Sequence, residues 1–222
     1  SSIITSALEE TSARGGKAEV LTFRTSQERK DIATGLLKGF RKVGVNGQGI
    51  VHSNFLEVQR LAANAELIDV SKELEASRLI KDAEEVGRMR KACAIASRVA
   101  DEIPSILRKG MKEYEAAAEL DYRMTKMGAS GAAFGTNASF GASSAEPHHG
   151  AEDISLKVGD TALFDFGCKV EGYCSDITRT FFFGEPKDWQ RRMYQVVTEA
   201  QQAALRVIKA GVNGMAVDEA AR

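Results

Sequence analysis

Two aspartates in apolar surroundings are the residues of this chain best suited to chemistry. The segments 163–166 and 177–183 are rich in aromatic and β-branched residues and predict two β-strands, each carrying one aspartate, Asp165 and Asp176, inside an otherwise apolar run. A carboxylate in a buried strand is costly unless it is paired or binds a cation. Two carboxylates on one face could share divalent ions about 3.5–4 Å apart, so the pattern predicts metal-assisted chemistry.

The loop between the two strands decides whether the aspartates meet. Residues 169–172 read Lys-Val-Glu-Gly, and glycine is favoured in a tight hairpin turn. A two-residue turn at 170–171 places Asp165 directly opposite Asp176, with Cβ atoms about 4.5–5.5 Å apart. A turn at 171–172 makes the pair diagonal but keeps one face, whereas a three-residue loop without a bulge separates them.

Neighbouring side chains leave the role of the aspartates open. In the structural alternative, each carboxylate forms a salt bridge with a cation such as Arg179 or Lys169. Thr178 and Thr180 share the face of Asp176, where a hydroxyl could orient a carboxylate or only pack across the strands. Arg179 points to the other face, where we expect a structural salt bridge.

Three helices are predicted to support the hairpin. Asp82 and Glu85 form a capping box that begins the first helix, and Gly110 ends it. Its apolar face, at helical spacing, consists of Val86, Met89, Cys93, Ala96, Ala100, Ile103 and Leu107. A second helix covers about 112–127, and the third is capped by Asp188. The buried face predicted for the third helix consists of Trp189, Met193, Val196, Ala200, Ala204 and Val207.

The first part of the chain alternates strand and helix patterns. Strands are predicted at 20–23, 42–45 and 66–70, and helices at 27–40 and 54–63. Such alternation predicts a layered sheet covered by helices. The sequence therefore predicts an α+β protein, with a small α/β domain at 1–77 and a second domain at 78–222.

Composition excludes several classes of function. The 222 residues include 30 basic and 31 acidic ones, a net charge of −1, which predicts no binding to nucleic acid or to an anionic membrane. No apolar run approaches the about 18 residues of a membrane span, and Ser1 begins no signal-peptide pattern. Three cysteines, an odd number, are typical of a reducing cytosol and predict free thiols in a cytoplasmic protein.

A long motif around the aspartates resembles a known family. Residues 165–167, Asp-Phe-Gly, and 172–180, Gly-Tyr-Cys-Ser-Asp-Ile-Thr-Arg-Thr, resemble the signature of Xaa-Pro dipeptidases (prolidases) and Xaa-Pro aminopeptidases. Residues 78–85 and 147–149 match too, and weaker similarity extends over nearly the whole chain. These are pita-bread metallopeptidases of the methionine-aminopeptidase type, family M24. The resemblance implies a partial creatinase/prolidase-like N-terminal α/β domain, followed by the first half of a pita-bread catalytic domain.

The resemblance also implies roles for single residues. Asp165 and Asp176 would be ligands of two divalent ions, Mn²⁺ or Co²⁺ in preference to Zn²⁺, because carboxylates favour harder ions. His148 would lie in the active site outside the metal ligands, contacting the substrate or stabilising the tetrahedral intermediate, and His149 is the weaker candidate. The implied reaction is hydrolysis of Xaa-Pro bonds, in dipeptides or at peptide N-termini, by a metal-activated water in a homodimer.

The same resemblance predicts a chain that is incomplete at both ends. The family completes its two metals with one histidine and two glutamates from a second half, and no histidine follows Asp176 here. Residues 106–111 and 207–212 are similar, which predicts an internal repeat whose second copy lacks its strands. The chain alone is therefore expected to be inactive. Two other functions stay open, a metal-free peptidase-like binding module and a creatinase-like hydrolase, although both aspartates argue against them.

Overall fold

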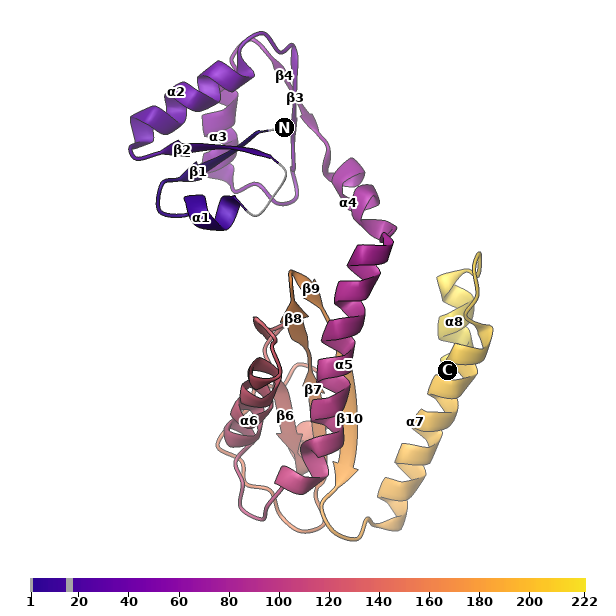
Figure 1. The fold of residues 1–222 in the computed structure, drawn as a ribbon. Coiled ribbons are helices and arrows are strands. Elements are labelled where there is room, and N and C mark those ends of the chain that lie inside the picture. Colours follow the sequence, from indigo (N-terminus) through magenta and orange to yellow (C-terminus); the bar gives the residue numbers. More distant parts are fainter. Residues whose placement is uncertain (1, 15–17) are drawn as a thin grey trace. The chain divides into compact units, whose positions relative to one another are not determined.

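The computed structural model describes residues 2–14 and 18–222, and the chain divides into two compact units, Ser1–Lys81 and Asp82–Arg222 (Figure 1). The strands of the first unit are β1 (Ser2–Ser6), β2 (Glu19–Phe23), β3 (Lys42–Val45) and β4 (Glu66–Asp69). Its helices are α1 (Glu10–Ala13), α2 (Ser26–Leu37), α3 (His52–Leu61) and α4 (Ser71–Leu79).

The strands of the first unit form two parallel pairs, β1 with β2 and β3 with β4. Parallel neighbours need a crossover connection, and in sequence α1 and α3 stand at the two crossovers. The strands and helices predicted for this part are confirmed to within a few residues. The single layered sheet is not formed, because the described strands pair only two by two.

The second unit is built on one long hairpin. Its strands are β5 (Gly131–Ala132), β6 (Asn137–Phe140), β7 (Thr161–Phe166), β8 (Cys168–Val170), β9 (Tyr173–Cys174) and β10 (Ile177–Phe182), and the short helix η1 (Gly141–Ala145) follows β6. The strands pair antiparallel in the orders β10-β7-β6 and β5-β8-β9, so the hairpin β7-β8/β9-β10 runs through both sheets. Its turn lies at Glu171 and Gly172, whose φ values of 48° and 87° are the two positive angles of a type I′ turn.

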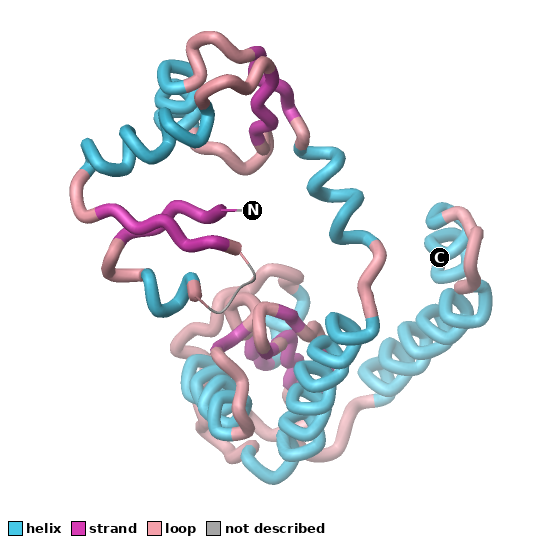
Figure 2. Tube along the Cα trace, turned by 45° about the horizontal axis from the view of Figure 1, so that its top comes forward, coloured by secondary structure: helices cyan, strands magenta, loops and turns pink. Residues whose placement is uncertain are grey.

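Two helices, α5 (Ala83–Ile106) and α6 (Glu113–Lys126), cover the apolar face of these sheets (Figure 2). Alternate residues of β7 are buried on this face, namely Ala162, Phe164 and Phe166. The rings of Phe140 and Phe164 meet edge to face with centroids 6.1 Å apart. The opposite face of β7 carries Thr161, Leu163 and Asp165, none of them fully buried, so Asp165 lies on the side away from this core.

The capping box predicted for α5 is confirmed. The Glu85 amide donates to the Asp82 side chain at 2.9 Å, and the Asp82 amide donates to the Glu85 carboxylate at 2.7 Å. The predicted buried face is displaced by one residue at one position, because Ala92 is buried and Cys93 is exposed. The buried stripe of α5 consists of Ala92, Ala96, Val99, Ala100 and Ile103.

The buried face predicted for the third helix, α7 (Asp188–Val207), is wrong. Trp189 is 57% exposed and Met193 is 59% exposed, because α7 packs mainly against α8 (Gly214–Ala221) (Figure 1). The helix contacts the sheet near its start, where Gln190 Nε2 donates to Thr161 Oγ1 at 3.1 Å and the Tyr194 ring meets that of Phe182. Asp188 does not cap α7 either, since the N-cap is Lys187, whose amide donates to the Gln190 side chain at 2.7 Å. No helix in the described ranges is long and apolar enough to cross a membrane.

Candidate active site

The register of the hairpin places the two aspartates on a diagonal. Thr178 of β10 stands directly opposite Asp165 of β7, and Lys169 stands opposite Cys174 in the same register. Asp176 lies two positions before Thr178, so strand alternation puts it on the same side as Asp165. The turn at 171–172 is therefore the one that forms, and the direct Asp165–Asp176 pairing expected for a turn at 170–171 does not.

Asp165 lies in the middle of a polar row that crosses three strands. On one side, the Thr178 hydroxyl donates to Asp165 Oδ1 at 3.0 Å. On the other side, Asn137 of β6 is the cross-strand partner of Asp165, and it is buried and accepts a hydrogen bond from Ser139 Oγ. Of the two roles considered for Thr178, the structure shows the orienting one: its hydroxyl fixes one oxygen of a half-buried carboxylate.

Neither aspartate has a cationic partner among the described residues. The salt bridge expected for Arg179 does not form among the described residues; the Arg179 guanidinium instead donates to the Thr178 carbonyl of its own strand at 2.9 Å. Asp176 is exposed and its carboxylate forms no hydrogen bond within the described part of the chain. The expectation that both aspartates lie in buried strands is therefore wrong for Asp176.

Gly167, two residues after Asp165, packs so closely against Ser175, the residue before Asp176, that only glycine fits there. A Cβ atom at this position would lie 1.9 Å from the Ser175 carbonyl oxygen and 3.2 Å from the Phe134 ring. Two hydrogen bonds hold the strands together here, from the Ser175 amide to the Cys168 carbonyl at 2.9 Å and from the Cys168 amide to Ser175 Oγ at 3.0 Å. The close approach fixes the position of Asp176, the residue that follows Ser175.

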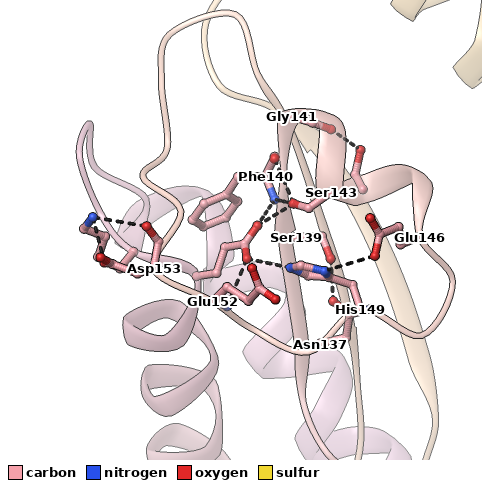
Figure 3. Close-up of polar contacts among 12 residues, drawn as sticks. Asn137, Ser139, Phe140, Gly141, Ser143, Glu146, His149, Glu152 and Asp153 are labelled. Carbon is pink, nitrogen blue, oxygen red and sulfur yellow. Dashed lines mark hydrogen bonds and ion pairs between the residues drawn. The ribbon is translucent and has the colours of Figure 1, made fainter.

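His148 lies in the loop that follows η1. Its ring is exposed and forms no hydrogen bond or ion pair with the residues that the structure describes. The next residue, His149, is buried and points into a cluster of polar groups (Figure 3). The structure thus separates the two histidines: one faces solvent, and the other anchors the loop.

The cluster around His149 is centred on Glu113, the first residue of α6, which is fully buried. His149 Nε2 lies 2.7 Å from Glu113 Oε2. The other carboxylate oxygen accepts the Phe140 amide at 2.7 Å and the Ser143 hydroxyl at 2.5 Å. The Glu152 amide donates to Oε2 at 3.1 Å. One buried carboxylate therefore gathers four donors from β6, η1 and the loop that follows.

The pKa values of the buried pair move apart. Burial acts to raise the pKa of Glu113, but hydrogen bonds from Ser143, His149, Phe140 and Glu152 outweigh it and lower that pKa. The hydrogen bond to Glu113 raises the pKa of His149 against the effect of burial. Both shifts favour the ion pair of carboxylate and imidazolium.

Sequence reasoning missed Glu113 and ranked His149 second. An acidic residue in the first turn of a helix is common, because it stabilises the helix dipole, and it carries no signal of burial. The partners lie 36 residues apart in the chain. Only the buried neighbours of Glu113, which the fold brings together, reveal its role.

The described residues hold no group of three or more histidine, cysteine, aspartate or glutamate side chains that could bind a metal ion. Asp165 and Asp176 are two carboxylates on one face, and no cationic side chain of the described residues is paired with either. That donor set is suited to a divalent ion that takes further ligands from elsewhere.

Similarity to known proteins extends over both units. A match to Metallopeptidase family M24 spans residues 87–222. The Xaa-Pro dipeptidase of Pyrococcus furiosus is 34% identical over 208 residues, which are 93% of this chain and 58% of that protein. An uncharacterized peptidase of Bacillus subtilis, YqhT, is 33% identical over 83% of this chain and 52% of its own length.

Solved structures agree on the fold. The X-Pro aminopeptidase from Thermotoga maritima matches with a TM-score of 0.90 at 32% identity, covering 98% of this chain and 62% of that one. The prolidase from Pyrococcus furiosus matches with a TM-score of 0.87 at 30% identity, covering 98% of this chain and 63% of that one. The predicted α+β fold, with part of a prolidase-like domain, is confirmed. The chain spans less than two thirds of these relatives.

Proposed function

Because the chain belongs to metallopeptidase family M24, we propose that it carries part of a metal-dependent peptidase that cleaves Xaa-Pro bonds. The polar row at the hairpin is the observation that carries this proposal. Asp165 is oriented by Thr178, and Asp176 lies on the same side of the hairpin without a cationic side chain paired to it among the described residues. The names of the similar proteins, Xaa-Pro dipeptidase and X-Pro aminopeptidase, supply the substrate class.

Two divalent ions fit the donors that the chain provides. Carboxylate oxygens favour Mn²⁺ or Co²⁺, with Zn²⁺ as the alternative, and Asp165 and Asp176 would each supply oxygen ligands. When bound, such ions activate water and polarise the scissile carbonyl. The bound pair needs further ligands, which we place outside this chain, in the remaining part of the peptidase.

The chain's own residues would orient the two aspartates and hold the substrate. Thr178 keeps Oδ1 of Asp165 fixed, which would leave Oδ2 available to bind an ion. Gly167 sets the distance between the strands that carry the two aspartates. His148, exposed on its loop, would donate a hydrogen bond to the substrate or to the negative charge that develops on the carbonyl oxygen.

The test uses Asp165→Asn and Asp176→Asn in the full-length protein, with Asp188→Asn as control. Asp188 is an exposed first-turn residue of α7 outside the hairpin. We expect both site variants to lose bound metal and to cleave an Xaa-Pro dipeptide at least a hundredfold more slowly, while the control keeps both. Unchanged metal content and cleavage in Asp165→Asn would overturn the proposal. A wild type that binds no divalent metal would instead favour the metal-free binding module.

Assembly and location follow the family resemblance. We propose a homodimer in the cytoplasm, with residues 1–77 as part of a creatinase-like N-terminal domain. All three cysteines are free thiols, which is compatible with a reducing compartment. Sedimentation of the full-length protein tests the dimer.

A further inference from the structure

One carboxylate organises the whole segment around His148. The donors to Glu113 come from Phe140 at the end of β6, Ser143 in η1, and His149 and Glu152 in the loop beyond. His148 stands inside this segment, directly before the buried His149. The path of the backbone on both sides of His148 is therefore tied to a single buried group.

We propose that Glu113 and His149 form a latch that positions His148 for the substrate. This inference rests on the proposed function, because it assigns the latch to the same active site. Glu113 and His149 are positioning residues: neither is offered as a group that touches the substrate. The latch fixes the main chain at His149, and His148 is joined to it by one peptide bond.

Burial explains why the latch must be a pair. A carboxylate with no exposed surface, such as that of Glu113, is costly unless each oxygen is hydrogen-bonded and the charge is compensated. The three other donors to Glu113 are neutral, so His149 is the one partner of Glu113 in the described chain that can carry a positive charge. Loss of His149 would leave a buried charge with neutral donors only, and the segment would shift to let water in.

Three carboxylates act on the His149 ring, those of Glu113, Glu146 and Glu152. Glu113 faces Nε2 from α6, and Glu146 Oε2 lies 3.7 Å from Nδ1. The charge of Glu152, from the loop beyond, acts on the ring in the same direction. Three carboxylates near one imidazole, with one at hydrogen-bonding distance, raise the pKa of His149 and so favour its cationic form, whose charge a neutral side chain in this place would not supply.

The experiment compares wild type with His149→Ala, His149→Gln and the control Ser144→Ala in the full-length protein. Ser144 Oγ donates to the Gly141 carbonyl at 2.7 Å, so the control removes a hydrogen bond from the same segment without touching Glu113. The first measurement is hydrogen–deuterium exchange of the amides in 141–152, which needs no activity. The second is kcat and KM for an Xaa-Pro dipeptide, with bound metal measured on each sample.

We expect His149→Ala to exchange these amides at least tenfold faster and to lose at least tenfold in kcat at unchanged metal content. Ser144→Ala stays near wild type. His149→Gln recovers only part of both losses, because its amide nitrogen can donate to Glu113 as Nε2 does but carries no positive charge. His149→Asn, whose shorter amide takes the place of Nδ1, serves as the disrupted variant should the alanine variant not fold.

The outcomes separate the latch from the proposed function. Unchanged exchange in His149→Ala overturns the latch, whether or not the wild type is active. Faster exchange with unchanged kcat and KM overturns the positioning of His148. A wild type that cleaves no Xaa-Pro bond overturns the proposed function, and the exchange measurement still decides whether Glu113 and His149 hold the segment.

Discussion

Replacing Gly167 by alanine should displace one strand of the hairpin. The added Cβ would lie 1.9 Å from the Ser175 carbonyl oxygen, whereas real Cβ atoms essentially never come within 3.0 Å of such an atom. The Ser175 backbone must therefore retreat by about 1 Å or more. Backbone is less able to yield than a side-chain tip, and both hydrogen bonds between Cys168 and Ser175 would lengthen with the shift.

The expected cost follows from that displacement. Overpacking that forces backbone shifts costs typically about 1–3 kcal/mol. Because Gly167 meets main-chain atoms, we expect the upper end, about 3 kcal/mol. At about 2–4 °C per kcal/mol for a protein of this size, the melting temperature should fall by roughly 6–12 °C. A displacement of 1 Å between Asp165 and Asp176 should also lower Xaa-Pro cleavage in the full-length protein about a hundredfold.

Thermal unfolding followed by circular dichroism measures the effect, with Gly87→Ala as the matched control. Gly87 lies inside α5, and its Cβ would meet nothing within 4 Å. Alanine in a helix interior is favoured over glycine by about 1 kcal/mol, so the control should unfold at a slightly higher temperature. If Gly167→Ala unfolded at the wild-type temperature, the reasoning from the carbonyl contact would be refuted.

Two further predictions concern buried titratable groups. Cys168 should resist a thiol reagent in the native protein while Cys93 and Cys174 react, because burial raises the pKa of the Cys168 thiol and the other two are exposed; equal labelling of all three would contradict this. The Glu113–His149 pair should stabilise the fold most between its two titrations. Because the pKa of Glu113 is lowered, its ionised form stabilises the fold above the ordinary glutamate pKa of 4.5, and this stability is lost as pH falls through the lowered pKa. Because the pKa of His149 is raised, its protonated form stabilises the fold below the ordinary histidine pKa of 6.5, and this stability is lost as pH rises through the raised pKa. Urea midpoints of wild type and Glu113→Gln should therefore differ most in that window, and a difference independent of pH would argue against the ion pair.

The hairpin was predictable because its signals are local. Aromatic and β-branched residues mark both strands, and a glycine marks the turn. The choice between the two registers was not predictable, since the turn that forms requires a positive φ at Glu171, a residue that seldom adopts one. The diagonal arrangement of Asp165 and Asp176 follows from that choice. Their role as metal ligands, and the role of His148, stay predictions.

Local sequence spacing predicts the apolar face of a helix but not whether that face is buried. Spacing of three and four residues predicts an apolar stripe on a helix, and it does so for α5 and α7 alike. The stripe of α5 is buried because two sheets lie against it, whereas Trp189 and Met193 of α7 are exposed. The spacing of apolar residues therefore predicts which side of a helix is apolar, whereas the tertiary fold determines which elements cover that side.

The placement of charge explains why the two aspartates can stay without a cationic partner. At the roughly 7–8 Å of a diagonal pair, two carboxylates repel by only about 0.5 kcal/mol in water. Asp176 is exposed, so water screens its charge and the fold tolerates the pair. Glu113 has no such access, and its charge is compensated by His149 and three further donors. The chain thus neutralises the charge that it buries and leaves open the charges that a divalent ion can reach without breaking an existing ion pair.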